Sequence, residues 1–265
     1  MSPRPVIALL TDFGIRDHYV GTMKGVMLGV CPDASLVDIS HDIPAHDVLA
    51  GAFELAASYR YFPQGAIFLV VVDPGVGSTR RGIAAECGEH LFVAPDNGVL
   101  SIVFDEIPPR RIVELGDPRY ARPDISKTFE GRDRFAPAAA WLASGLELSA
   151  LGRPADHPVM LDVPRPAVTS GSLDGQVVRI DRFGNLVTNI DRRTFTGFAG
   201  SDSIVIQIAG RDIAGVISTY ADGRPGELCA LFGSSDRLEL ALNGASAAAF
   251  TGATRGSAVH VGRRA

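Results

Sequence analysis

A nearly continuous apolar run, Ala66 to Val72, is the feature that most constrains the fold of this chain. Runs of this kind are typical of strands buried on both faces of a parallel sheet, because helices cover the two faces. The run ends on an aspartate, and the segment Phe68 to Arg81 (FLVVVDPGVGSTRR) continues through a glycine-rich turn to two arginines. A carboxylate at the carboxyl end of a buried strand, with a guanidinium shortly after it, indicates a charged pocket in an α/β protein.

Strand-like and helix-like segments alternate through the first half of the chain, as they do in βαβ units. Besides the run above, we expect strands at Val6–Leu10, Ser35–Ile39, Ile83–Glu86 and His90–Val93, and helices at Tyr19–Val30, Asp47–Tyr59 and Phe135–Leu142. This pattern predicts an α/β N-terminal domain with a mostly parallel sheet.

The sequence changes character between about residues 153 and 175, where prolines crowd the chain and serines and glycines follow them. Beyond this stretch, turn residues separate short segments typical of strands: Gln176–Ile180, Val187–Ile190, Ile204–Ile208, Glu227–Leu231 and Leu238–Leu242. We therefore predict an N-terminal α/β catalytic domain at residues 1–160, a linker at 161–174 and a smaller C-terminal β-barrel domain at 175–265. A small sandwich fits the same strand pattern.

Composition argues against several classes of partner. The net charge is -5, and no basic stretch carries interleaved aromatic residues, so we expect no nucleic-acid partner. The cysteines and histidines show no spacing typical of metal ligands or of a disulfide framework, so we expect no metal and no disulfide. No stretch approaches the ~20 apolar residues that span a bilayer, and the N-terminal apolar run is too short for a secretory signal. We expect a cytoplasmic protein with no membrane partner.

Two aspartates follow predicted strands in the first half. Asp12 could accept hydrogen bonds from a ribose diol, although a turn aspartate that caps the next helix is the better interpretation of that motif alone. Asp73 precedes a Pro-Gly turn, and Arg80 or Arg81 could return to pair with it and keep it ionised. A purely structural ion pair is the alternative.

Three further motifs carry polar residues at turns. Asn97-Gly98 is a strong turn signal, and we interpret it as structural. Glu130 and Asp133 precede a predicted helix, where capping explains Asp133 better than Glu130. In the segment Asp181 to Asn185, an aromatic ring and an amide could bind a planar base, but a glycine-containing turn or bulge explains the motif equally well.

Six blocks in this order resemble the S-adenosyl-L-methionine hydroxide adenosyltransferase family, the relatives of the fluorinase and chlorinase enzymes. They are LLTDFGIRDHYVGTMKGV, VDISHDIPAHDV, YFPQGAIFLVVVDPGVGSTRR, APDNGVLS, TFEGRDRFAPAAA and IDRFGNLVTNI. The resemblance implies an N-terminal α/β domain, a C-terminal β-barrel, and a homotrimer with active sites between one subunit's N-domain and its neighbour's C-domain. It also implies hydrolysis of S-adenosyl-L-methionine at C5′ to adenosine and L-methionine, with no cofactor, and in some members a preference for the sulfonium epimer that cells do not use.

By position, the resemblance also implies roles for single residues. The expected substrate contacts are Asp12 at the ribose diol, Asp17 and Asp181 at the methionine end, Phe183 and Asn185 at the adenine, and Ser234, Ser235 and Asn243 in the segment that completes the pocket.

Around the attacking water, Asp73 and Arg80 match the family pattern, but Glu130 replaces the histidine of TFHGRD. Two carboxylates there would repel a halide, so we expect water as the nucleophile. Because of this replacement, a module that binds S-adenosyl-L-methionine or adenosine with weak or no turnover is the alternative function. A metal-dependent phosphoesterase that uses the strand-end aspartates is a third.

Overall fold

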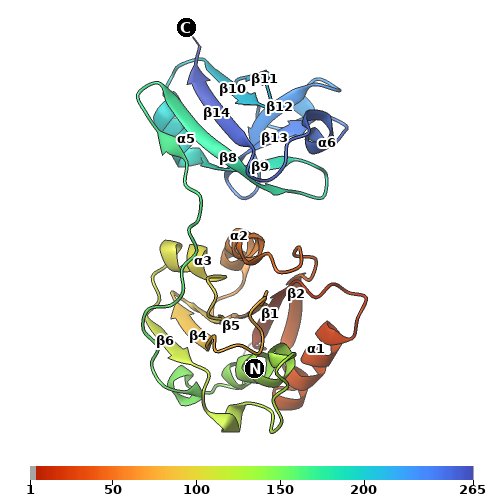
Figure 1. The fold of residues 1–265 in the computed structure, drawn as a ribbon, viewed down its shortest axis with the longest axis vertical. Helices are drawn as coiled ribbons and strands as arrows, with labels where there is room; N and C mark the ends of the chain where they lie inside the picture. The colour runs from red at the N-terminus through yellow and green to blue at the C-terminus, as the bar shows by residue number, and fades with distance from the viewer. Residues whose placement is uncertain (1–3, 265) are drawn as a thin grey trace. The chain divides into compact units, whose positions relative to one another are not determined.

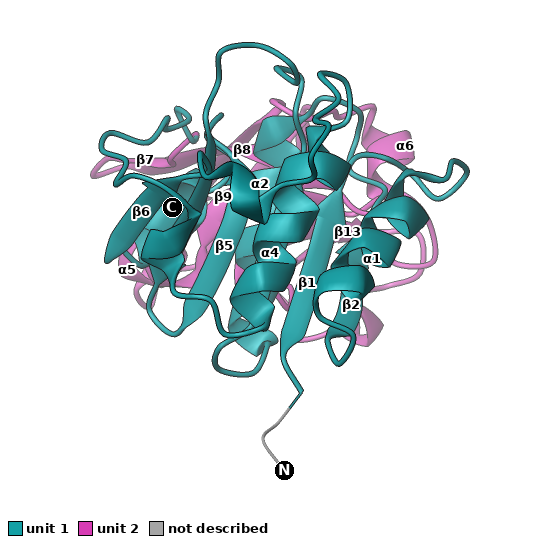
Figure 2. Ribbon diagram, turned by 90° about the horizontal axis from the view of Figure 1, so that it is seen from below, with its two compact units in different colours: residues 1–163 teal, residues 164–265 magenta. Residues whose placement is uncertain are grey.

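The computed structural model describes residues 4–264, which divide between Val163 and Pro164 into two compact units, called unit 1 and unit 2 here (Figure 2). The division falls inside the predicted linker at 161–174. That segment also contains the short strand β7 (Ala167–Val168) and the start of β8 (Ser172–Ile180).

Unit 1 is built on a six-stranded sheet with the order β2-β1-β3-β5-β4-β6. Its strands are β1 (Val6–Thr11), β2 (Ser35–Ser40), β3 (Ile67–Val71), β4 (Gly82–Cys87), β5 (His90–Pro95) and β6 (Arg111–Glu114). The pairs β1–β2, β1–β3 and β3–β5 are parallel, whereas β4 is antiparallel to both β5 and β6. The sheet is therefore mixed, and the reversed strand β4 brings its first residue to the edge at which β5 ends.

Helices cover both faces of this sheet (Figure 1). They are α1 (Tyr19–Val30) and α4 (Ala136–Ala143) on one face, and α2 (Val48–Ser58) and α3 (Ser101–Glu106) on the other. Along β1, Ile7 and Leu9 pack into the core with α1 and α4, while Ala8 and Leu10 pack into the core with α2 and α3. Because successive side chains of a strand point to opposite faces, a strand between two helical layers must be apolar throughout.

Unit 2 is an antiparallel sheet with the order β11-β10-β14-β8-β9-β13-β12, with β7 paired to β8. Its further elements are β9 (Leu186–Asp191), α5 (Arg192–Ala199), β10 (Ile204–Ile208), β11 (Arg211–Ala214), β12 (Leu228–Phe232), β13 (Arg237–Leu242), α6 (Ala247–Thr251) and β14 (Ala258–Arg263). The amide of Ile217, just after β11, donates to the carbonyl of Ala230 on β12 at 2.8 Å. This bond brings the two ends of the sheet together into a nearly closed barrel, as predicted.

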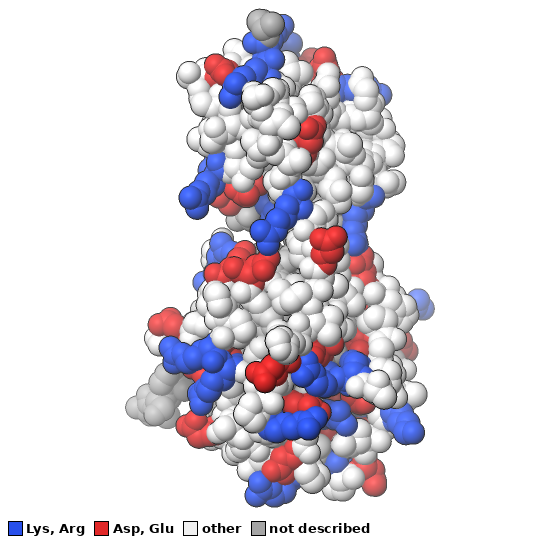
Figure 3. Space-filling view, turned by 60° about the vertical axis from the view of Figure 1, so that its left-hand side comes forward, with Lys and Arg blue, Asp and Glu red and all other residues white. Residues whose placement is uncertain are grey.

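Charged side chains of both signs are interspersed on the face drawn in Figure 3, which fits the small net charge of -5. Within residues 4–264, the structure contains no helix that is long and apolar enough to cross a membrane.

Candidate active site

The candidate site of unit 1 lies where three neighbouring parallel strands end. Asp12 directly follows β1, Asp73 lies two residues beyond β3, and Asp96 directly follows β5. The antiparallel β4 begins at the same edge, so Arg80 and Arg81, which precede it, arrive beside these carboxylates. Ligands of α/β proteins bind at this edge of the sheet.

Asp73, Arg80 and Glu130 form a buried ionic cluster. Arg80 Nε donates to Asp73 Oδ1 at 2.8 Å, and Arg80 Nη2 donates both to Asp73 Oδ2 and to Glu130 Oε2, the latter at 2.8 Å. The three side chains are 4%, 9% and 8% exposed, for Asp73, Arg80 and Glu130 in that order. Of the two arginines left open by the sequence, Arg80 is the partner of Asp73, and Arg81 pairs with Asp96 instead.

Burial is the largest influence on the charges of this cluster. It raises the pKa of Asp73 above the ordinary aspartate value, and the nearby charge of Glu130 adds to the rise, against the lowering by the hydrogen bonds from Arg80. For Arg80, burial lowers the pKa, but the hydrogen bonds and charges of Asp73 and Glu130 more than offset it. A second guanidinium, Arg134 Nη1, lies 3.7 Å from Glu130 Oε2.

The loop between β3 and β4 is shaped by its glycines. Gly77 has φ +77, and a Cβ there would lie 2.3 Å from the carbonyl oxygen of Lys127. Only glycine allows this approach, which packs the loop that carries Asp73 against the segment that leads to Glu130. On the other side of Arg80, the ring of Phe135 lies 5.2 Å from the guanidinium carbon and shields it from water.

Glu130 is placed by an irregular helix start. A π-helical turn, Gly131–Phe135, directly follows it and runs into α4. The predicted capping role of Asp133 is wrong, because its carboxylate accepts from the amide of Ser126 at 2.9 Å and pairs with Arg132 and Arg122.

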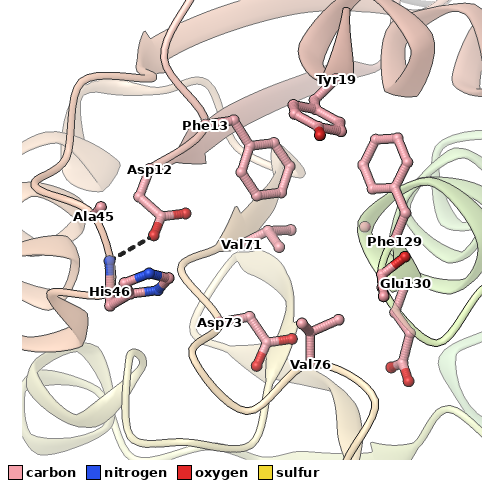
Figure 4. Close-up of a pocket in the computed structure, with 12 residues that line it drawn as sticks. Asp12, Phe13, Tyr19, Ala45, His46, Val71, Asp73, Val76, Phe129 and Glu130 are labelled. Atoms are coloured by element: carbon pink, nitrogen blue, oxygen red, sulfur yellow. Dashed lines mark hydrogen bonds between the residues drawn. The ribbon is translucent and has the colours of Figure 1, made fainter. Parts of the chain in front are cut away.

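A cavity of about 290 Å³ opens above the cluster, and both Asp73 and Glu130 line it, as does Asp12 (Figure 4). Asp12 does not cap α1, because the cap position is His18; its Oδ2 instead accepts from the backbone amide of His46 at 2.8 Å. Asp17 is exposed in the loop before α1 and does not line this cavity.

Three aromatic rings form the opposite wall of the cavity, and the sequence did not single them out. Phe13, Tyr19 and Phe129 contact one another with ring centroids 5.0 to 6.0 Å apart (Figure 4). A cavity with aromatic rings on one side and carboxylates on the other suits a cationic organic ligand.

Unit 2 carries a second cavity of about 640 Å³, which holds most of the substrate contacts expected there. Asp181, Phe183, Asn185, Ser234 and Asn243 all line it. Ser235 does not, and its buried hydroxyl has no hydrogen-bond partner within the described part of the chain.

The Asp181 to Asn185 segment forms the glycine-containing turn that was one of its two interpretations, and the binding of a planar base stays a prediction. Asp181 accepts from the amides of Phe183 and Asn185 at 2.9 and 2.8 Å and from Asn185 Nδ2 at 2.9 Å, so both polar side chains stabilise the turn. Gly184, with φ +83, faces Ser246 where a Cβ would clash. The turn leaves Phe183 78% exposed at the edge of the cavity, where its ring could stack on a planar ligand.

A buried carboxylate in this cavity was not foreseen. Glu239 on β13 is 5% exposed and accepts from the Tyr220 hydroxyl at 2.8 Å. Burial raises the pKa of Glu239, and the charge of Asp181 adds to the rise. The alternation in LELAL along β13 predicts that this glutamate faces solvent, so its burial could not be predicted from the sequence pattern.

Across residues 4–264, no three His, Cys, Asp or Glu side chains are grouped as a metal site would require. The three cysteines are free and buried.

Fold and site together define a class: a two-unit protein in which an α/β unit with a buried Asp–Arg–Glu cluster precedes an antiparallel barrel. Comparison with known proteins identifies the family within this class. The model of the SAM hydroxide adenosyltransferase N-terminal domain matches residues 7–152, and that of the C-terminal domain matches residues 175–260. The chain belongs to the SAM hydroxide adenosyltransferase family, as the sequence motifs predicted.

Individual relatives agree with this assignment. The chain is 38% identical to a protein of Thermus thermophilus named (R)-S-adenosyl-L-methionine hydrolase, over 97% of this chain and 99% of that one. It is 31% identical to a fluorinase of Actinoplanes sp., over 71% of this chain and 72% of that one. The structure of an uncharacterized conserved protein from Thermotoga maritima superposes with a TM-score of 0.92 at 33% identity, covering 97% of this chain and 100% of that one.

Proposed function

We propose that this protein is an enzyme that hydrolyses S-adenosyl-L-methionine at C5′ to adenosine and L-methionine. The observation that carries the proposal is the Asp73–Arg80–Glu130 cluster at the wall of a cavity, in a chain whose relatives over nearly full length are named (R)-S-adenosyl-L-methionine hydrolases.

The reaction needs little help at the leaving group. The water oxygen forms a bond to C5′ as the C5′–S bond breaks. The electron pair of the breaking C5′–S bond goes to sulfur, so the sulfonium becomes the neutral thioether of methionine. One proton leaves the attacking water. The enzyme must therefore hold water in line with the C5′–S bond and supply an acceptor for that proton.

We assign the proton acceptance to Asp73. Its carboxylate lines the cavity, while Arg80 lies behind it and fixes its orientation through two hydrogen bonds. Glu130 lines the same wall and shares Arg80, so it is in reach to help position the water. A raised pKa at Asp73 makes this carboxylate a better base than an ordinary aspartate.

Charge selects water over a halide as the nucleophile. Asp73 and Glu130 present their carboxylates to the cavity, whereas the arginines that pair with them, Arg80 and Arg134, do not line it. A halide entering between these carboxylates is repelled, whereas neutral water is bound by them.

We further propose that Asp12 binds the ribose diol and that Phe183 and Asn185 bind the adenine, as the family resemblance implies. The other proposed substrate contacts are Asp17, Asp181, Ser234, Ser235 and Asn243.

The cavity of unit 1, at about 290 Å³, is at the low end for small-molecule pockets. This supports the family arrangement of a homotrimer, in which unit 2 of a neighbouring subunit completes the site. The names of the relatives support the (R) sulfonium epimer as the preferred substrate. The predicted cytoplasmic location and the lack of a cofactor stay predictions.

The decisive assay uses purified protein, the separated (R) and (S) epimers, and chromatography of adenosine and methionine. Equal amounts of the two products are expected, with faster release from the (R) epimer. In water enriched in ¹⁸O, the label must enter the 5′-hydroxyl of adenosine. Chelator and chloride or fluoride are added in parallel: loss of activity with chelator, or 5′-halogenated adenosine as the main product, contradicts the proposal.

The replacement of the family histidine by Glu130 favours one alternative, a binding module with weak or no turnover. Titration calorimetry separates the two functions. Tight binding of either epimer without release of adenosine identifies the module, above all if Glu130→His then creates turnover.

A further inference from the structure

One turn of unit 1 makes hydrogen bonds to the chain on both sides of the Asp73–Arg80 pair. The turn, Pro95–Gly98, begins at the last residue of β5. The Asn97 side chain donates from Nδ2 to the carbonyl oxygen of Val72 at 2.8 Å, and Val72 is the residue before Asp73. The Asp96 carboxylate accepts from Arg81 Nε at 2.9 Å and from Arg81 Nη2 at 2.5 Å, and Arg81 is the residue after Arg80.

Both contacts are partly buried and well defined. The Asp96 side chain is 2% exposed, and its backbone amide also donates to the carbonyl of Arg81 at 2.9 Å. The Asn97 amide group cannot rotate freely, because its Oδ1 accepts from the amide of Val99 at 3.2 Å while its nitrogen contacts Val72. Val72 is fully buried, so its carbonyl depends on such a donor.

We propose that Asp96 and Asn97 are positioning residues for catalysis, which fix the relative placement of Asp73 and Arg80 by holding Val72 and Arg81. Neither residue lines the cavity of unit 1, so they act only through the pair. The inference rests on the proposed function and extends it to a motif whose Asn-Gly sequence alone indicated only a structural turn.

The geometry of the pair gives the reason for two such anchors. The loop from Asp73 to Arg80 must bring a carboxylate and a guanidinium into a two-point contact, and displacement of either end by about 1 Å is enough to cost a large part of the rate. Hydrogen bonds from one rigid turn to both ends of the loop set the distance between them.

The same turn also has a plainly structural role, which a test must separate. Asp96 Oδ1 accepts from the amide of Val159 at 2.8 Å, and Ser101 Oγ accepts from the amide of Leu161 at 2.8 Å and donates to the Gly98 carbonyl at 2.6 Å. Ser101 therefore holds the same segments without contacting Val72 or Arg81. Ser101→Ala is the matched control.

The experiment compares Asn97→Ala and Asp96→Asn with Ser101→Ala and the wild type. The first readout is the pKa of the Asp73 carboxyl, followed by ¹³C NMR and assigned with Asp73→Asn. A looser Arg80 contact lets this pKa rise, by about 0.5 or more, in both test variants. For Asp96→Asn this direction is diagnostic, because removal of a nearby negative charge alone lowers the pKa of a carboxyl.

The second readout is kinetic. We expect kcat of both test variants to fall about tenfold or more with KM within about threefold, and Ser101→Ala to stay within about twofold of the wild type in both. Assays are run well below each melting temperature, so that loss of folded protein does not contribute.

The two readouts keep the proposals apart. If the wild type releases no adenosine, the proposed function is wrong, and the NMR titration still decides whether the turn positions the pair. If the Asp73 pKa of Asn97→Ala and Asp96→Asn matches that of Ser101→Ala, or falls in Asp96→Asn, the positioning role is wrong. Should Asn97→Ala not fold, Asp96→Asn alone decides.

Discussion

Arg80 holds Asp73 by a two-point contact, from Nε to Oδ1 at 2.8 Å and from Nη2 to Oδ2, with both side chains more than nine-tenths buried. A guanidinium fork bonded to both carboxylate oxygens fixes the plane of the carboxylate as well as its position. Since Asp73 lines the cavity and Arg80 does not, the structure presents one oriented carboxylate to the ligand space and keeps its counter-charge behind it.

Removal of the Asp73 charge should abolish most turnover while the fold survives. Asparagine keeps the size and two-point shape of the side chain but cannot take a proton from water, so Asp73→Asn is expected to lower kcat by ~10²-fold or more. Adenosine release measures the effect, and circular dichroism checks the fold. Glu86→Gln, at a carboxylate that pairs with Arg111 on β6, is the control and should keep wild-type activity. Undiminished adenosine production by Asp73→Asn removes this residue from the mechanism.

Arg80→Lys tests whether turnover depends on the two-point contact of the Arg80 guanidinium with Asp73 or only on its positive charge. Lysine keeps one positive charge but cannot bond both oxygens of Asp73 in one plane and Glu130 as well. We expect kcat to fall by about tenfold or more, with a smaller change in KM. Steady-state kinetics with varied substrate separates the two constants. A variant with wild-type kcat would show that charge alone is sufficient.

The pH dependence of activity should depend on Glu130. Because the pKa of Asp73 is raised, by burial first and by the Glu130 charge in addition, the base is lost to protonation at a pH above the ordinary aspartate value of about 4. Glu130→Gln removes the second cause, so the acid limb of kcat/KM is expected to move to lower pH. The measurement is a pH profile of adenosine release.

Two outcomes of that profile would contradict this assignment. A limb that stays in place or moves to higher pH shows that Glu130 does not act on Asp73, and complete loss of activity assigns the proton acceptance to Glu130 itself. Glu147→Gln, at an exposed position after α4, is the control and should leave the limb unmoved.

Local sequence patterns predicted the elements that carry the site better than the contacts between them. The apolar spacing predicted α1 with its observed bounds, Tyr19 to Val30, and the run Ala66 to Val72 predicted β3, which is one residue shorter at each end. The choice between Arg80 and Arg81 could not be made locally, since it depends on Asp96, which follows the strand β5, and on Phe135, in the π-helical turn before α4.

Several elements were not predicted, for reasons that differ. The short helix α3 and strand β6 are held by the surrounding sheet and helices, and their own sequences carry little periodicity. In contrast, α5 begins after Asp191, whose carboxylate accepts from the Thr194 amide at 2.8 Å, and this capping pattern was visible in the sequence. The alternation of β14, AVHVGR, was visible too.

Asp133 should make the folded state depend on acid. Burial raises the pKa of Asp133, but the hydrogen bonds from Arg132 and the Ser126 amide lower it by more than burial raises it. The net shift of the pKa is therefore downward. A carboxyl whose folded pKa is depressed stabilises the protein above its unfolded pKa of about 4, and this contribution is lost as the pH falls through the lower, folded value. Thermal melts from pH 7 to pH 2 should show the loss.

Asp133→Asn should remove part of that acid sensitivity. At pH 7 we expect it to lower the free energy of unfolding by about 2 kcal/mol, less than for a fully buried pair because the partner arginines are partly exposed. Denaturant titration at pH 7 and pH 3 measures both effects. An equal stability difference between variant and wild type at the two pH values contradicts the role given to this carboxylate.

Gly77 and Gly65 form a matched pair of test positions. Comparing them isolates the effect of the close approach between Gly77 and Lys127, which shapes the loop from β3 to β4. Both have a positive φ, +77 and +79, so alanine costs a similar backbone strain of about 1 kcal/mol at either position. Only at Gly77 does the new Cβ meet another atom, the carbonyl oxygen of Lys127 at 2.3 Å; at Gly65 there is nothing within 4 Å. We therefore expect Gly77→Ala to destabilise the protein by about 1 to 3 kcal/mol more than Gly65→Ala.

Gly77→Ala should also lower kcat, because the clash displaces the loop that carries Asp73 and Arg80, whereas Gly65→Ala keeps wild-type turnover. Denaturant unfolding and adenosine release on the two variants measure this, and equal behaviour of the pair would show that the approach to Lys127 does not hold the catalytic loop.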